Sequence, residues 1–151
     1  MIYESTISYL TQDNNGNDKV VKETYALDNY DTFEGVETRM YGTFQHLRDL
    51  DVIAIKRSNA TEVINNRTSE NDKVWIAEVI DTFVDDDGNE KETHYRFLLY
   101  SLTFETANNA VKEHLKQGYG DLEIVSLKRT RIREIFVSKC LNTAISTSLS
   151  K

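Results

Sequence analysis

An internal repeat with an offset of 72 residues is the feature that most constrains how this sequence can fold. The stretch "DVIAIKR" at residues 51–57 returns as "EIVSLKR" at residues 123–129. Self-similarity at a fixed period indicates a structural unit that is present twice. The same offset relates further positions along the chain: Tyr3 to Trp75, Ile7 to Val79, Gly16 to Gly88, Tyr25 to Phe97, Leu27 to Leu99 and Glu62 to Glu134.

Each copy begins with two predicted strands joined by a tight turn. Apolar and polar residues alternate over residues 2–11 and 73–84, and again over 19–29 and 90–101, which is typical of half-buried strands. The intervening "QDNNGND" and "DDDGNE" contain Asn, Asp and Gly, which tolerate the positive φ of a hairpin turn. Odd-numbered positions are expected to face the core: Val21, Tyr25 and Leu27 in the first copy, and Tyr95, Phe97 and Leu99 in the second.

The hydrophobic spacing then changes to that of a helix. Asp31 with Glu34 is a candidate capping box for the first helix, and Thr103 is a candidate N-cap for the second. Residues 58–64 and 130–136 are each expected to form a short closing turn of helix. The helical stripes are Phe33, Val36, Met40 and Phe44, then Phe104, Ala107, Val111 and Leu115; the third strands have Ile53, Ile55, Val125 and Leu127 as buried positions.

These patterns predict an α+β fold made by tandem duplication of a ββαβ unit, with six strands and two main helices packed on one sheet face. Residues 1–136 are expected to form a single domain of two repeats, 1–64 and 73–136, joined by the polar connection 65–72. Residues 137–151 are interpreted as a polar C-terminal tail.

Composition limits the classes of function. The chain has 151 residues, 39% of them hydrophobic, and a formal net charge of −7. That charge repels nucleic acid and anionic membranes at long range, so such binding would require a local basic patch. The single cysteine, Cys140, favours a reducing compartment. With no apparent leader or membrane segment, the sequence predicts a soluble cytoplasmic protein that does not bind membranes.

The even-numbered face of the second copy is unusually apolar for a solvated sheet face. Its cover is expected to be a second layer of the chain, a partner subunit or a ligand, and a homo-oligomer is therefore one expectation. The apolar residues at these even-numbered positions are Ile76, Ile80, Leu98, Tyr100 and Ile124. Basic residues are also found at even-numbered strand positions: Lys22, Lys56, Arg96 and Lys128.

Recognisable catalytic and cofactor motifs are missing from the sequence. The histidines His46, His94 and His114 do not occupy matching positions in the two copies. The "DDDGNE" stretch resembles a calcium loop only superficially, because the position of its glycine and the spacing of the distal glutamate are wrong, and it is interpreted as a turn. We therefore expect a protein that is not an enzyme and that carries no cofactor or metal.

One basic cluster stands out against the acidic chain. The stretch "KRTRIR" at residues 128–133 carries four positive charges, and Arg129, Arg131 and Arg133 would share one side of a continuous strand. Arginine forks suit phosphate oxygens, and aromatic rings can stack on bases. Basic residues at strand ends also discourage aggregation, and the aromatic residues are equally consistent with core positions. The predicted phosphate-binding residues are Lys56, Arg57, Lys128, Arg129, Arg131 and Arg133, with Tyr3, Trp75 and Arg96 as stacking or supporting residues.

The segments "MIYESTISY", "YALDNYDTFEGVE", "AIKRSNATEVI" and "KVWIAEV" resemble an uncharacterised domain-of-unknown-function family of Bacteroidota and their crAss-like phages. The resemblance spans roughly residues 1–136, and its most specific element is Ile-Lys-Arg-x-Asn at residues 55–59. A proline that often precedes the second-strand tyrosine in that family is Thr24 here, and the tail after Phe136 is additional. The resemblance implies a bacterial or phage cytoplasmic setting, with a phage accessory protein favoured, and implies no activity.

Three functional hypotheses remain at the level of sequence. The first is a non-enzymatic module that binds single-stranded nucleic acid through the Lys/Arg cluster. The second is a phage counter-defence protein that sequesters a signalling nucleotide with the same arginines. The third is a structural or adaptor protein that acts through protein contacts.

Overall fold

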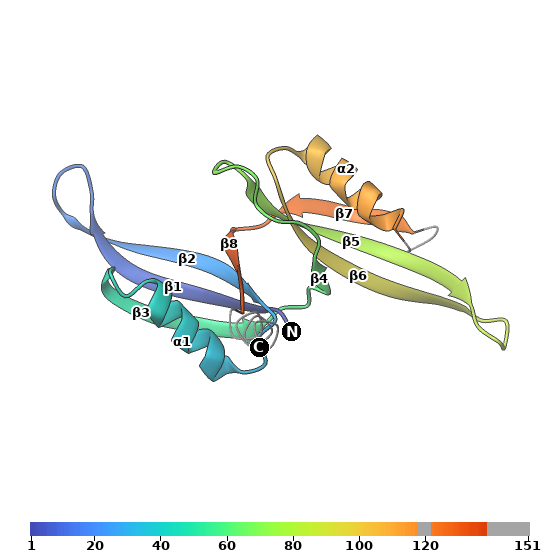
Figure 1. Cartoon of the computed structure of the whole chain (residues 1–151), viewed down its shortest axis with the longest axis horizontal. Helices are drawn as coiled ribbons and strands as arrows, with labels where there is room; N and C mark the ends of the chain where they lie inside the picture. The colour runs from blue at the N-terminus through green and yellow to red at the C-terminus, as the bar shows by residue number, and fades with distance from the viewer. Residues whose placement is uncertain (118–121, 139–151) are drawn as a thin grey trace, which may run out of the picture. The chain divides into compact units, whose positions relative to one another are not determined.

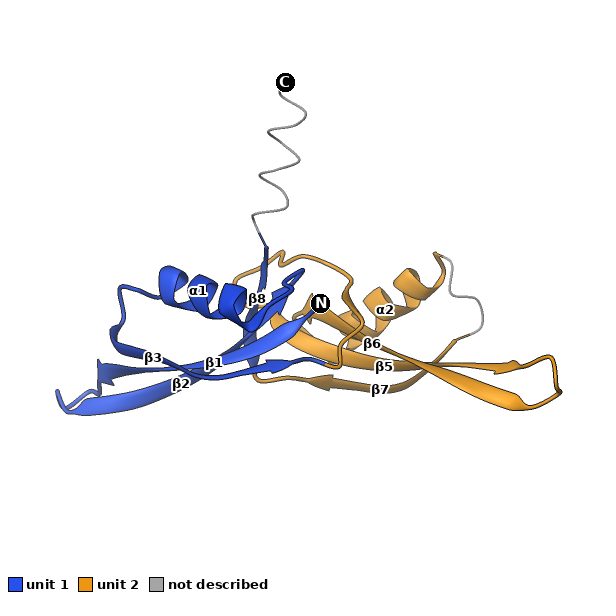
Figure 2. Cartoon of the chain, turned by 90° about the horizontal axis from the view of Figure 1, so that it is seen from below, with its two compact units in different colours: residues 1–58, 132–151 blue, residues 59–131 orange. Residues whose placement is uncertain are grey.

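The computed structural model describes residues 1–117 and 122–138 of the chain (Figure 1). The chain divides into two compact units. Unit 1 contains residues 1–58 together with the segment that begins at Ile132, and unit 2 contains residues 59–131 (Figure 2). Each unit therefore includes a short segment from the other sequence repeat.

Both units have the same arrangement of one four-stranded sheet and one helix. The sheet of unit 1 has the order β3-β1-β2-β8, and the sheet of unit 2 has the order β4-β6-β5-β7. Unit 1 consists of β1 (Tyr3–Gln12), β2 (Asp18–Asp28), α1 (Phe33–Thr43), β3 (Arg48–Arg57) and β8 (Ile132–Val137). Unit 2 consists of β4 (Glu62–Val63), β5 (Lys73–Val84), β6 (Glu90–Ser101), α2 (Phe104–Leu115) and β7 (Glu123–Arg129).

The predicted fold class is wrong. The described residues form eight strands in two separate sheets, with one short helix on each, in place of six strands with two helices on one face. The main error concerns residues 58–64 and 130–136, which were expected to be helical turns and which contain β4 and most of β8. Short apolar runs do not reveal their own conformation. Here the open edge of a sheet supplies backbone partners that local propensity does not anticipate.

The two added strands are exchanged between the repeats. β4 lies at the end of the first repeat but pairs in parallel with β6, where Glu62 lies opposite Phe97. β8 lies at the end of the second repeat but pairs in parallel with β2, where Ile135 lies opposite Ala26. Each repeat thus supplies the last strand of the other repeat's sheet. β4 contains only two residues, Glu62 and Val63. Its Glu62 side chain also contacts α2, because the His114 Nε2 atom lies 2.9 Å from Glu62 Oε1.

Each helix packs on the odd-numbered face of its sheet, as the alternation predicts. The core of unit 1 contains Tyr3, Ile7, Tyr25, Leu27, Val36 and Met40, and the core of unit 2 contains Trp75, Ala77, Val79, Phe97, Leu99, Ala107, Val111 and Leu115. The first residue of each predicted helical stripe is an exception. Phe33 is 48% exposed and Phe104 is 56% exposed, because both lie at the first helical position and beyond the edge of the core.

Matching β-bulges correct two further predictions. Ile53 and Val125 were expected to be buried, and they are 44% and 45% exposed. The register shifts between Thr6 and Ile7 on β1, and at the corresponding place on β5, so Val52 and Ile124 take the paired positions. A bulge inserts one extra residue into one strand and turns it out of the alternation.

Local turn and cap chemistry agrees closely with the sequence patterns. Thr103 is the N-cap of α2, as predicted, whereas α1 is capped by Thr32 and not by Asp31. In the first hairpin turn, Asp13 Oδ1 accepts from the N–H groups of Asn15 and Asn17, and Asp85 makes the equivalent bonds in the second. The turn glycines have φ values of 80° and 82°. The interpretation of "DDDGNE" as a turn is confirmed.

A buried carboxylate organises the connection that leads into β5. Asp72 is 6% exposed, and its Oδ2 atom accepts from the Thr68 N–H at 2.9 Å and the Ser69 N–H at 3.1 Å. The Thr68 N–H bond, with smaller contributions from the other donors, lowers the pKa of the Asp72 carboxyl below its ordinary value despite its burial. The ionised carboxylate is therefore favoured in the folded state.

Asp72→Asn is expected to lower the free energy of unfolding by about 1 kcal/mol at neutral pH, since the amide accepts these bonds more weakly. Because the folded pKa is depressed, the contribution of the carboxylate is complete above about pH 4 and is lost as the pH falls through the folded pKa. Urea denaturation of both proteins at several pH values measures this difference. A difference that grows on acidification would contradict the assignment.

Candidate functional site

The structure divides the six predicted phosphate-binding residues between the two units. Lys56, Arg57 and Arg133 belong to unit 1, and the other three, Lys128, Arg129 and Arg131, belong to unit 2. β7 ends at Arg129, the chain bends at Arg131, and β8 begins at Ile132. The stretch "KRTRIR" is therefore not one continuous strand, and the expectation that its three arginines share one side does not hold.

Within each Lys-Arg pair, the two side chains are assigned to opposite faces of the sheet. Arg57 lies opposite Tyr3, whose side chain belongs to the core under α1, and Lys56 lies opposite Glu4. The Lys56 Nζ atom is 3.9 Å from Glu4 Oε2. In unit 2, Arg129 lies opposite Trp75 and Lys128 lies opposite Ile76. The arginines thus belong with the helix face, and the lysines with the open face.

Arg133 is held by a largely buried carboxylate. Its Nε atom lies 3.1 Å from Oε2 of Glu23, whose side chain is 11% exposed. The hydroxyl group of Tyr25 donates to the same carboxylate at 3.3 Å. Burial and the adjacent Glu23 raise the pKa of the Tyr25 hydroxyl, and they raise that of Tyr9 as well. This arrangement gives Arg133 a structural role in closing β8 onto β2.

An exposed phenylalanine lies beside an arginine-bearing strand end in unit 1. The Phe33 ring packs edge-on against Tyr3, with ring centroids 5.4 Å apart and an interplanar angle of 73°. The guanidinium carbon of Arg57 is 6.0 Å from the centroid of the Phe33 ring. We call these two residues the Phe33–Arg57 pair. Phe33 is about half exposed, so part of its ring is available to solvent.

Unit 2 has an exposed phenylalanine and an arginine at the corresponding positions. The Phe104 ring contacts Trp75 edge-on, with centroids 6.2 Å apart at 66°, and Arg129 is aligned with Trp75 in the neighbouring strand. We call Phe104 and Arg129 the Phe104–Arg129 pair. Trp75 itself is 6% exposed and its indole N–H donates to the carbonyl group of Ser101. Tyr3 and Trp75 are therefore buried residues that contact the exposed rings of Phe33 and Phe104, and they are not themselves accessible for stacking.

Sequence reasoning missed Phe33 and Phe104 because helical spacing places both in the core stripe. The signal that identifies them is their position directly after the N-cap threonines Thr32 and Thr103. A residue at the first helical position lies at the end of the helix, where the sheet below provides less cover. Their recurrence in both repeats is the second signal.

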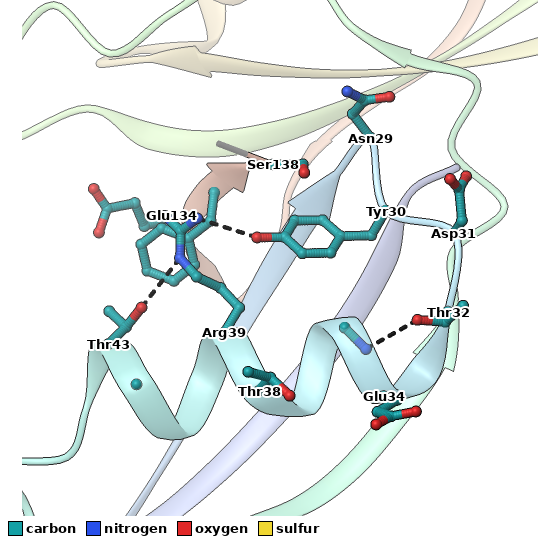
Figure 3. Close-up of a pocket in the computed structure, with 13 residues that line it drawn as sticks. Asn29, Tyr30, Asp31, Thr32, Glu34, Thr38, Arg39, Thr43, Glu134 and Ser138 are labelled. Atoms are coloured by element: carbon teal, nitrogen blue, oxygen red, sulfur yellow. Dashed lines mark hydrogen bonds between the residues drawn. The ribbon is translucent and has the colours of Figure 1, made fainter. Parts of the chain in front are cut away.

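A groove of about 1220 Å³ runs between α1 and β8 of unit 1 (Figure 3). Arg39 crosses it and donates to the Tyr30 hydroxyl and the Val137 carbonyl, both at 3.1 Å. Its guanidinium also lies 5.0 Å from the Phe136 ring centroid. Among residues 1–117 and 122–138, the other charged side chains that line the groove are acidic: Asp31, Glu34 and Glu134. These carboxylates disfavour an anion in the groove, and Arg39 links α1 to β8 across it.

Over residues 1–117 and 122–138, no group of three histidine, cysteine or carboxylate side chains is arranged to hold a metal ion. Neither α1 nor α2, the helices of these ranges, combines the length and apolar character of a membrane span. Cys140 lies outside the described residues.

The fold and the repeated pairs define a duplicated protein in which each unit is a four-stranded sheet covered by one helix that starts with an exposed phenylalanine. The chain belongs to the family described as a domain of unknown function (DUF4494), which matches residues 1–138. The resemblance to an uncharacterised family is thereby confirmed at that level. No curated protein matches the sequence.

Proposed function

We propose that this protein is a non-enzymatic module that binds single-stranded nucleic acid through the Phe33–Arg57 and Phe104–Arg129 pairs. The observation that carries the proposal is the presence of the same exposed ring and arginine-bearing strand end in both units. An exposed phenylalanine gives a base a flat apolar surface, and an arginine fork contacts the adjacent phosphate. Arg131, which is exposed beyond the end of β7, extends the basic surface of unit 2.

Base stacking accounts for the use of phenylalanine at these positions. Stacking on an aromatic side chain contributes about 1–3 kcal/mol per base and tolerates any sequence. A helix start needs no aromatic side chain, because Thr32 and Thr103 already cap the N–H groups. Binding through few arginines on a chain of net charge −7 would be weak at physiological salt and would weaken further as salt is added, with a slope set by the number of phosphates contacted.

The proposal includes the setting that the family resemblance implies. We place the protein in the cytoplasm of a bacterial host and favour a phage origin, with self-association as a means of extending the bound strand. The nucleotide-sequestering and adaptor alternatives predict different ligands. A mononucleotide alone would bind as tightly as a strand in the first alternative, and only another protein would bind in the second.

Fluorescence anisotropy with a labelled oligothymidine is the direct test. Phe33→Ala and Phe104→Ala are each expected to weaken binding about tenfold, and affinity is expected to fall with added salt. Phe83→Ala is the matched control, because Phe83 is 45% exposed and lies near the hairpin end of β5. Circular dichroism checks that each variant retains its fold.

Two outcomes would overturn the proposal. The first is that the unaltered protein fails to bind the oligonucleotide at low ionic strength. The second is that the Phe83 variant loses as much affinity as the other two. Arg57→Gln and Arg129→Gln provide an independent check, since each should flatten the salt dependence while leaving the stacking surface intact.

A further inference from the structure

We infer that a small polar pocket on the open face of unit 2 binds the phosphate group of a phosphomonoester. The pocket is about 240 Å³ in volume and lies on the even-numbered face of the sheet, opposite to the face covered by α2. This site is separate from the Phe–Arg pairs, which belong to the helix face. Its lining residues are Asn59, Ile76, Glu78, Arg96, Ser126 and Lys128.

Strand pairing brings the polar side chains of the pocket together. On β5, Glu78 lies opposite Arg96 of β6 on one side and opposite Ser126 of β7 on the other. The next row on the same open face places Lys128 opposite Ile76. Side chains that are directly opposite on neighbouring strands have Cβ atoms about 5 Å apart, so Arg96 and Ser126 flank Glu78 closely. Lys128 lies one row further along β7, and all four side chains line the same pocket.

The charges of the pocket are unequally satisfied. Glu78 Oε1 lies 3.0 Å from His94 Nδ1 and 3.5 Å from Arg96 Nη2, so the carboxylate has partners on its own strand pair. Lys128 is exposed and has no ion pair among the described residues. With two cationic side chains and one anionic side chain in its lining, the pocket retains a positive excess at Lys128.

In the first repeat, polar side chains on the corresponding face are paired with one another. There the counterpart of Lys128 is Lys56, which lies 3.9 Å from the Glu4 carboxylate. The counterparts of Glu78 and Arg96 are Thr6 and Thr24, whose hydroxyl groups hydrogen-bond to each other at 2.9 Å. In the second repeat Ile76 replaces Glu4, which leaves the lysine without its carboxylate. The unpaired lysine is therefore specific to unit 2 and is not a by-product of the fold.

The pocket has several hydrogen-bond donors. They suit a phosphate group, which has several oxygen atoms, better than a ligand with a single charged atom. Lys128 offers an ammonium group, Arg96 a guanidinium fork, Ser126 a hydroxyl and Asn59 an amide, and these can reach different oxygens of a tetrahedral anion. Glu78 can accept a hydrogen bond from a hydroxyl group next to the phosphate. A sugar phosphate and the 5′-terminal phosphate of a strand share this chemistry.

Isothermal titration calorimetry with inorganic phosphate and with ribose 5-phosphate tests the site. Saturable binding is expected for the unaltered protein, and Lys128→Met should weaken it about tenfold or more, because a charge-assisted hydrogen bond is lost. Lys56→Met is the matched control from the first repeat and should leave the affinity unchanged. Lys128→Arg keeps the charge and should retain most of the binding.

The two sources of phosphate can be separated with oligothymidines that carry or lack a 5′-phosphate. If the 5′-phosphate strengthens strand binding in the unaltered protein but not in Lys128→Met, the ligand is a strand end. If only ribose 5-phosphate is affected by Lys128→Met, the ligand is a small sugar phosphate. The absence of saturable binding of both small phosphates at millimolar concentration, or an equal loss in Lys56→Met, would overturn the inference. Neither outcome depends on whether Phe33 and Phe104 bind bases.

Discussion

Phe136→Ala is expected to lower the free energy of unfolding of unit 1 by about 3 kcal/mol. The Phe136 ring of β8 stacks on Tyr25, with centroids 5.3 Å apart and planes within 16°, and lies 6.0 Å from the ring centroid of Phe44. The guanidinium carbon of Arg39 also lies 5.0 Å from the centroid of this ring. Truncation removes the aromatic contacts that hold β8 against β2 and α1, and it leaves that part of the groove between α1 and β8 without its aromatic lining.

Hydrogen exchange followed by mass spectrometry measures this effect locally. Amides of β1 and β2 should lose protection in Phe136→Ala, because these strands form the sheet that β8 completes. Val137→Ala is the control: Val137 is the next residue on the same strand and is 44% exposed, so its loss should change stability by less than about 0.5 kcal/mol. Equal protection of β1 and β2 in the two variants would show that β8 does not stabilise this sheet.

Arg133→Ala is expected to lower the free energy of unfolding by about 1–3 kcal/mol, because it leaves the shielded Glu23 carboxylate without its cation. Tyr25 still donates to that carboxylate but cannot neutralise it. Arg131→Ala is the matched control, since Arg131 is exposed and lies two residues earlier in the same basic stretch. Urea denaturation followed by circular dichroism measures both variants.

The Arg133 prediction also separates stability from ligand binding. Oligonucleotide affinity should be almost unchanged in Arg133→Ala and should decrease in Arg131→Ala. The reverse pattern, with full stability and lost binding in Arg133→Ala, would show that Arg133 is a ligand-binding residue and that its contact with Glu23 contributes little. The two arginines are equivalent in the sequence pattern, and only their structural surroundings distinguish them.

Several local features could be predicted from the sequence because they depend on neighbouring residues alone. The Asn, Asp and Gly residues of the two hairpin turns take the positions that positive φ and side-chain acceptors require. Thr103 caps α2 as expected. The period-two alternation also placed Tyr25 and Phe97 correctly in the cores. Each of these depends on interactions within a few residues or on a pattern that is continuous along one element.

Features that depend on distant partners could not be predicted in the same way. The segment 132–137 has no local reason to pair with β2, which lies more than a hundred residues earlier, and its apolar residues fit a helix or a strand equally well. The bulges that expose Ile53 and Val125 arise from the match between neighbouring strands. The candidate site was misjudged for the same reason, since the "KRTRIR" stretch reads as one patch only if its strand continues.

The sequence by itself determined that this protein is built from two copies of one pattern, with hairpins, helices and core faces in the same order. Those properties follow from hydrophobic periodicity, turn residues and caps, which act over short distances. Only the tertiary structure decided that the last strand of each repeat joins the other repeat's sheet, that Lys128 and Arg129 belong to opposite faces, and that Phe33 and Phe104 remain exposed. The physical reason is that backbone pairing and side-chain burial are completed by residues far away in the chain, which no local pattern specifies.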